Sequence, residues 1–235
     1  MMIKTFLNKF LNGTTPVHKK PVKPWMKKEI RDGVTVELLD DLLKSLPRNK
    51  FIEQRAVLCI LLLYITGCRI NELRNFNFYS LQGFINDGSI TIYAFKTKSI
   101  RRIDISENER LLLKSYKNLI QKFYKNIPKD SSVLCAQSGK ELHNRTAIMW
   151  LNKLLKDLGN KYGLTIKSHS FRIGYITNLL KKHNVQVAKS MIGHSNIETT
   201  LRYDRNILNS EDVKDLRSKL DSDSKLLQLI DKSIP

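Results

Sequence analysis

The sequence predicts a mainly α-helical domain with one small antiparallel β-sheet, an α+β fold. Apolar residues recur at helical spacing through most of the chain, whereas residues 89–105 alternate apolar and polar side chains as paired strands do. A chain of 235 residues, 41% of them apolar, is long enough to bury its own core. These three observations favour one folded domain of this class.

Two helices and a short third one are expected in the first half of the domain. The helical pattern starts at Thr35, before VELLDDLLKSL, and stops at Pro47. Residues 51–66 are apolar nearly all round, which predicts a helix buried at the centre of the domain. Gly67 ends this helix, and a short helix is expected over residues 70–75, INELRN.

The pattern then changes to that of strands and back to that of helices. SITIYAF and RRIDI predict a β-hairpin over residues 89–105, with its turn in KTKSI. Ser106 and Glu109 form a capping box, which predicts a long amphipathic helix to about Asn126. A loop over 130–139 follows, and helices are expected over 144–158, 169–182, 185–192 and 197–203.

The two ends of the chain differ from the body in composition. Residues 13–34 contain three prolines and are rich in lysine, so residues 1–34 are expected to form a basic arm or linker. Residues 35–205 are expected to form the folded domain. Residues 206–235 contain the amphipathic stretches KDLRSKL and KLLQLID and are expected to form a tail.

The net charge points to a polyanionic partner. The chain has 41 Lys and Arg against 22 Asp and Glu, a net charge of +19. Residues 1–36 carry a net +6 and residues 204–235 a net −1, which leaves 27 basic and 13 acidic side chains in residues 37–203. Most of the excess therefore belongs to the folded body, as expected for a protein that binds phosphates on a shaped surface. Nucleic acid is the first candidate, and an anionic membrane surface is the second.

Cysteine usage and hydropathy argue against a disulfide-rich secreted protein and against a protein that spans a membrane. Cys59, Cys68 and Cys135 are odd in number and widely spaced, so they predict buried or half-buried thiols in a reducing, intracellular compartment. The longest apolar run, residues 56–65, is too short to span a bilayer, and no secretory signal pattern opens the sequence. No metal site is expected, because the spacing between the cysteines and three of the histidines matches no metal-ligand pattern; these are His18, His143 and His183.

His169 and Arg172 form the first candidate for a site with chemistry. Positions i and i+3 of a helix lie on one face, so these two side chains can contact one phosphate together. The expected helix N-terminus beside them also favours an anion. The alternative is a capping or surface role.

Arg69 and Glu72 form the second candidate. Arg69 follows the buried helix and the break at Gly67, so its side chain is expected to project rigidly from the rim of the core. Glu72 lies three residues later and can orient the Arg69 guanidinium. The alternative is an ordinary Arg–Glu helix pair, which contributes little to stability.

The third candidate pairs a histidine with a tyrosine near the end of the domain. His194 follows Gly193 at a helix break, and Tyr203 lies nine residues later on a separate short helix. A phenol is a weak nucleophile at neutral pH because its pKa is near 10. Nearby cations would favour its ionisation and stabilise the charge that develops at phosphorus in a phosphoryl transfer.

Together, these segments resemble the catalytic domain of tyrosine recombinases, the phage integrase family. TGCRINEL, HSFR and GHSNIETTLRY resemble the three sequence boxes of the family, in the family's order, over residues 35–205. FKTKSIRRIDI resembles the family's β-hairpin with a lysine in its turn. Lys96 is the best match to that lysine and Lys98 the second, because one sequence does not define the register of a hairpin.

The resemblance implies DNA strand cleavage and rejoining without metal, ATP or another cofactor. Tyr203 would attack the scissile phosphate, form a 3′-phosphotyrosyl link and release a 5′-hydroxyl. The other implied roles are phosphate clamping by Arg69 and Arg172, phosphate bonding and proton transfer by His169, general acid catalysis by Lys96, phosphate bonding and site support by His194, and orientation of Arg69 by Glu72.

The resemblance also implies partners and alternatives. Double-stranded DNA would be the substrate, as in integration of a mobile element, with self-assembly from dimer to tetramer on the DNA. KLLQLID would dock on a neighbouring protomer or on its own domain. Two other functions remain open: a catalytically degenerate DNA-binding protein of the same fold, and a nicking-closing enzyme that resembles type IB topoisomerases.

The chain departs from the family pattern at its N-terminal end. Most members carry a separate helical DNA-binding domain before the catalytic domain. Here only about 35 residues precede the segment that resembles the catalytic domain. Three interpretations follow: a minimal recombinase, a fragment, or the partner of a separately encoded DNA-binding subunit.

Overall fold

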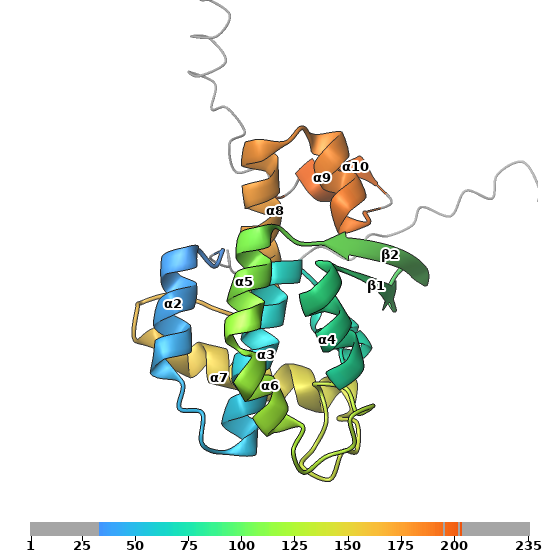
Figure 1. The fold of residues 1–235 in the computed structure, drawn as a ribbon. Helices are drawn as coiled ribbons and strands as arrows, with labels where there is room; N and C mark the ends of the chain where they lie inside the picture. Colours follow the sequence, from blue (N-terminus) through green and yellow to red (C-terminus); the bar gives the residue numbers. More distant parts are fainter. Residues whose placement is uncertain (1–32, 195, 202, 204–235) are drawn as a thin grey trace, which may run out of the picture. The chain divides into compact units, whose positions relative to one another are not determined.

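The protein is described by a computed structural model, which covers residues 33–194, 196–201 and 203. These residues form a mainly helical fold with one two-stranded antiparallel sheet, so the expected fold class is confirmed (Figure 1). Nearly all of the expected arm, residues 1–34, and almost the whole expected tail, including KLLQLID, lie outside the described residues. None of the described helices is long and apolar enough to cross a membrane.

Helix α3 (Phe51–Thr66) lies at the centre of the fold, as its all-round apolar sequence predicts. Every residue from 54 to 63 is buried. Helices α2 (Val36–Ser45), α6 (Lys117–Phe123) and α8 (Ser168–Lys182) pack around it (Figure 1). Gly67 ends α3 in the left-handed conformation at φ 57°, where its N–H bonds the carbonyl of Leu63. The end of α3 therefore fixes the position of the next two residues, Cys68 and Arg69.

A short 3₁₀ helix, η2 (Ile70–Asn75), follows directly, as expected for a short helix over INELRN. Helix α4 (Phe78–Asp87) comes next and was not predicted. Its sequence, FYSLQGFIND, has a glycine and few strong helix formers. Two features stabilise it: Asn77 caps its N-terminus by accepting from the Ser80 N–H at 2.8 Å, and its apolar face packs on the hairpin.

The β-hairpin forms as predicted, from β1 (Ser89–Ala94) and β2 (Ser99–Asp104). Its register pairs Ser89 with Asp104 and Ala94 with Ser99, which leaves residues 95–98 as the turn. The Thr97 N–H bonds the carbonyl of Ala94 at 3.1 Å. Lys98 completes the turn in the left-handed conformation, at φ 51°.

The prediction of a single long helix from Ser106 to about Asn126 is wrong. The capping box does form, since the Ser106 N–H donates to the Glu109 carboxylate at 2.8 Å, but α5 (Glu107–Ser115) ends early. Helix α6 (Lys117–Phe123) starts after a break at Tyr116. The break allows α5 to pack on α4 while α6 packs on α3, a tertiary requirement that the local pattern does not contain.

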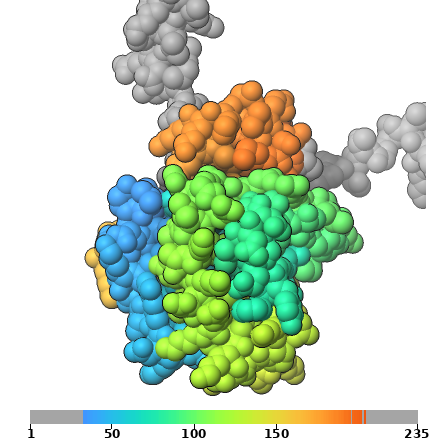
Figure 2. All heavy atoms as spheres, viewed as in Figure 1, coloured from blue at the N-terminus to red at the C-terminus, as the bar shows by residue number. Residues whose placement is uncertain are grey.

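Four helices complete the fold close to their expected positions. They are α7 (Asn144–Asn160), α8 (Ser168–Lys182), α9 (Val185–Ile192) and the short α10 (Ile197–Leu201). The first half of α8 packs on α3, and its second half forms a small separate core with α9, on which α10 packs in turn. In the space-filling view these orange C-terminal helices lie against the green middle segments of the chain (Figure 2). Helix α8 thus joins the two cores.

Candidate active site

Arg69 lies at the N-terminus of η2, directly after α3. Its Nη1 atom bonds Oε1 of Glu72 at 3.0 Å, and its backbone N–H bonds Oε2 of the same carboxylate at 3.1 Å. The Glu72 side chain is 1% exposed and the Arg69 side chain is 24% exposed. The buried carboxylate therefore holds the guanidinium from one side, and a guanidinium has further donors that can bind an anion.

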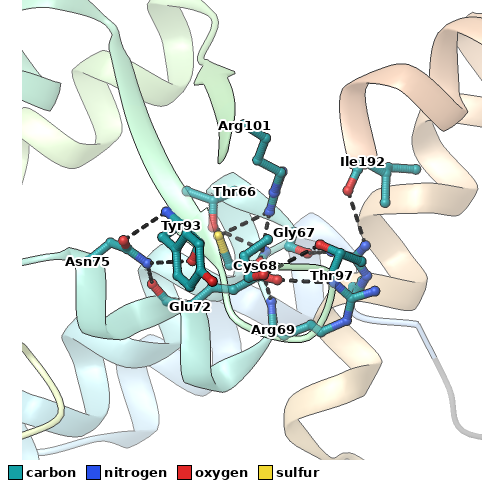
Figure 3. Close-up of polar contacts among 12 residues, drawn as sticks. Thr66, Gly67, Cys68, Arg69, Glu72, Asn75, Tyr93, Thr97, Arg101 and Ile192 are labelled. Carbon is teal, nitrogen blue, oxygen red and sulfur yellow. Dashed lines mark hydrogen bonds and ion pairs between the residues drawn. The ribbon is translucent and has the colours of Figure 1, made fainter. Parts of the chain in front are cut away.

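A second guanidinium, that of Arg101 on β2, shares the same carboxylate. Its Nη2 atom lies 3.0 Å from Oε2 of Glu72 and 3.3 Å from Sγ of Cys68 (Figure 3). Arg101 was not among the residues predicted from the sequence. Strand alternation could have found it, because Arg101 lies two residues from the apolar Ile103 and so shares its buried face, whereas Arg102 lies on the other face and is 67% exposed.

Two opposing effects act on the Glu72 carboxyl. Burial alone would raise its pKa. The charge and hydrogen bond of Arg101, together with the backbone N–H of Arg69, outweigh burial and hold the pKa of Glu72 below its ordinary value. Glu72 is therefore an anion at neutral pH, shared by two arginines.

Arg172 on α8 is the most enclosed cation of the site, at 1% exposed. Its Nη1 donates to the carbonyl of Gly67 at 2.7 Å, and its Nη2 donates to the carbonyl of Ile192 at 3.3 Å. Burial and the charge of Arg69 lower the pKa of Arg172 to about 10, so it stays charged at neutral pH. Its Nε atom is buried without a hydrogen-bond partner among the described residues. An unsatisfied buried donor on a cation is an incomplete site for an anion.

His194 lies between Arg172 and α10. Its Nε2 is 3.2 Å from Nη2 of Arg172, and its Nδ1 is 3.0 Å from Oγ1 of Thr200. A guanidinium can only donate, so we assign Nε2 as the acceptor and place the ring proton on Nδ1, toward Thr200. Burial, Arg172 and Arg69 lower the pKa of His194 to about 4, so the ring is neutral at pH 7.

Tyr203 lies between two histidines. Its hydroxyl is 3.1 Å from Nε2 of His169, and its ring stacks on that of His194 with a centroid distance of 6.0 Å and an interplanar angle of 24°. His169 precedes Arg172 by three residues on α8. The structure therefore brings a phenol, an imidazole and a buried guanidinium together from segments that are far apart in sequence.

The two candidate lysines lie elsewhere, in the exposed turn of the hairpin. Lys96 and Lys98 are both exposed, in the turn over residues 95–98 that follows the last strand pair. The strands below this turn carry Arg101, which joins the hairpin to the rest of the site. Lys96 therefore stays the prediction for the hairpin lysine, with Lys98 as the alternative.

The site has an excess of positive charge. Three arginines surround one buried carboxylate, and the carboxylate compensates only one of them; the arginines are Arg69, Arg101 and Arg172. The three free cysteines of the described chain are buried, and burial raises the pKa of Cys68 to about 11, so its thiol adds no negative charge. Within the described ranges, no group of three or more His, Cys, Asp or Glu residues is arranged to hold a metal. The arrangement is built to accept an anion with several oxygens.

Known proteins are similar to this chain in sequence. The family model described as "Phage integrase family" matches residues 34–209. Tyrosine recombinase XerA of Pyrococcus furiosus is 26% identical over 183 residues, which cover 77% of this chain and 60% of that protein. A tyrosine recombinase of Thermosipho africanus is 25% identical over 207 residues, 86% of this chain and 68% of that protein.

Solved structures are similar in fold. A crystal structure of XerA recombinase matches 88% of this chain and 68% of its own, with a TM-score of 0.56 and 18% identity. The Tn1549 transposon integrase in complex with transposon right end DNA matches 83% of this chain and 67% of its own, with a TM-score of 0.61 and 19% identity. The chain spans 60% of the length of the Pyrococcus relative. Because the family model covers residues 34–209, most of the sequence, the chain belongs to the phage integrase family of tyrosine recombinases.

Proposed function

We propose that this domain cleaves and rejoins DNA through a 3′-phosphotyrosyl intermediate, as in site-specific recombination. The observation that carries the proposal is the position of the Tyr203 hydroxyl, 3.1 Å from Nε2 of His169 and next to the buried cations of the site. A nucleophile beside a base and an incomplete anion site is what attack on a phosphodiester requires.

The reaction exchanges one phosphodiester for another. A bond forms between Oη of Tyr203 and phosphorus while the bond from phosphorus to the 5′-oxygen breaks. His169 accepts the phenol proton, and Lys96 supplies a proton to the departing 5′-oxygen. Attack by a 5′-hydroxyl reverses each step. The energy of the broken bond is kept in the adduct, so no nucleotide cofactor enters the reaction.

The arginines stabilise the charge that develops on the transferring group. Arg69 offers the donors that Glu72 does not use, and Arg172 offers its Nε, which has no hydrogen-bond partner within the described ranges. One well-placed donor to a developing oxyanion contributes about 10²–10³ in rate. His194 holds the Arg172 guanidinium through its Nε2 atom in the structure, which supports its proposed role in maintaining the site; direct bonding to the phosphate would require it to exchange this hydrogen bond.

DNA is the proposed substrate because of the excess of positive charge in residues 37–203 and in the site itself. The Tn1549 transposon integrase was solved with transposon right end DNA, and XerH was solved bound to its difH substrate. We extend the same substrate class to this chain, along with assembly of dimers or tetramers on the DNA, an accessory DNA-binding subunit, and integration of a mobile element.

The test is trapping of the covalent adduct on nicked suicide duplexes with randomised sequence around the scissile position. Wild-type protein should give a DNA adduct that survives SDS, and Tyr203→Phe should give none. Tyr175→Phe is the matched control, because Tyr175 is a half-buried tyrosine on the same helix as Arg172 and should keep the adduct. Absence of a wild-type adduct, or an adduct with Tyr203→Phe, would overturn the proposal.

A further inference from the structure

We infer that Arg101 is a positioning residue of this site, which holds the hairpin that carries Lys96 in register with the segment that carries Arg69. The inference rests on the proposed function for its catalytic consequence. It adds a residue that none of the sequence boxes contains, and its structural part can be measured without any reaction.

Arg101 joins three separate segments of the chain. From β2, its Nη2 reaches Glu72 in η2 at 3.0 Å and Sγ of Cys68 at 3.3 Å, while its Nη1 lies 3.4 Å from the carbonyl of Met191 at the end of α9. Its side chain is only 9% exposed. Figure 3 shows the side chain of Arg101 reaching toward Cys68. One guanidinium thus connects the hairpin, the Arg69 segment and the helix that precedes His194.

The stem of Arg101 is held as closely as its head. Gly193 has a φ of 70°, and a Cβ atom at this position would lie 3.2 Å from Cδ of Arg101. The left-handed glycine between α9 and α10 therefore also makes room for the arginine. This close packing limits the conformations of the Arg101 side chain, as expected for a residue that positions the hairpin relative to Arg69.

Glu72 makes the position of Arg101 matter for Arg69. The carboxylate bonds Arg69 through Oε1 and Arg101 through Oε2. A buried carboxylate that loses one of two cations turns toward the remaining partner or takes up water. Removal of Arg101 should therefore shift the Arg69 guanidinium and release β2 in the same event.

The hairpin has a second anchor, which keeps it folded when Arg101 is changed. The Asn75 amide donates to the carbonyl of Tyr93 at 3.1 Å and accepts from its N–H at 2.9 Å. These bonds hold β1 against η2, whereas Arg101 holds β2. Loss of Arg101 should thus loosen the turn that carries Lys96 without detaching the sheet.

The first measurement is amide hydrogen exchange, which does not depend on activity. Arg101→Met keeps most of the stem and removes the donors. Arg102→Met is the matched control, because Arg102 is the next residue of the strand, is 67% exposed and pairs with the exposed Asp104 at 2.8 Å. We expect faster exchange over residues 95–101 in Arg101→Met and unchanged exchange in Arg102→Met. Equal exchange in both would overturn the inference even if the proposed reaction is correct.

The second measurement is the single-turnover rate of adduct formation at saturating protein. A displacement of about 1 Å at a reacting group can cost about 100-fold in rate, so we expect a loss of that order for Arg101→Met. DNA affinity should change less than about threefold, because the buried guanidinium adds little to the field at the surface. Arg101→Lys keeps the buried charge beside Glu72 and should recover part of the rate; it replaces Arg101→Met if that variant does not fold.

A substrate with sulfur at the 5′-bridging position separates positioning from general destabilisation. A thiolate leaves without a general acid, so the defect of Lys96→Ala should disappear, and that of Arg69→Ala should persist. Arg101→Met should recover in part, because it displaces both groups. No recovery, a wild-type rate on the normal substrate, or a defect confined to DNA affinity would each overturn the inference. An absence of adduct with the wild-type protein would instead overturn the proposed function and leave hydrogen exchange to decide on Arg101.

Discussion

Gly67→Ala should separate the shape of this site from its charge. Gly67 has a φ of 57°, and a Cβ atom there would lie 2.6 Å from Cγ of Tyr175 and closer still to Cδ1. Its carbonyl also accepts from Nη1 of Arg172 at 2.7 Å. The substitution therefore changes no titratable group, but it forces apart the end of α3 and the helix that carries Arg172.

The magnitude follows from two separate costs. A non-glycine residue in the left-handed conformation costs about 1 kcal/mol. Overpacking against the Tyr175 ring costs about 1–3 kcal/mol more. The expected loss in the free energy of unfolding is therefore about 2–4 kcal/mol, a large part of the stability of a typical domain. Movement of the Gly67 carbonyl should also lower the rate of adduct formation by about 100-fold.

Gly163→Ala is the control, because Gly163 has a φ of 65° and a Cβ atom there would meet nothing within 4 Å. It should cost only the conformational part, about 1 kcal/mol, and leave adduct formation unchanged. Urea unfolding followed by circular dichroism measures both variants. Equal losses of stability in the two would refute the argument that Tyr175 makes Gly67 necessary.

Two further predictions concern pH and the core. Burial and the neighbouring arginines lower the pKa of His194 to about 4, whereas the ordinary value is about 6.5. Between these two pH values His194 is protonated in the unfolded chain and neutral in the folded chain, so the folded state loses stability as the pH falls. The urea midpoint should therefore fall as the pH is lowered through that window. His194→Gln should make the midpoint depend less on pH, and an unchanged pH dependence would contradict the assigned neutral ring. Leu61→Ala, in the fully buried face of α3, should cost about 2–5 kcal/mol, whereas Ile52→Ala on the same helix, where Ile52 is 57% exposed, should cost far less in the same urea experiment.

Local signals in the sequence predicted the elements that depend on neighbouring residues. The all-round apolar run of α3, the cap at Thr35 and the alternation over residues 89–105 each depend on neighbours a few positions away, and these elements appear where expected. The break at Tyr116 and helix α4 were not predicted, because α4 contains few strong helix formers and because the break serves packing against two different partners, α4 and α3.

The helical class, the hairpin and the positive charge follow from residues that are near one another in the sequence. Which side chains meet at the candidate site depends on how the elements pack. This packing placed the Gly67 carbonyl on Arg172, 105 residues away, and it brought the guanidinium of Arg101 to the carboxylate of Glu72, 29 residues away. The physical reason is one of range: helix and strand patterns depend on neighbours a few residues apart, whereas a buried carboxylate selects its cations from whichever segments the packed core brings within about 3 Å.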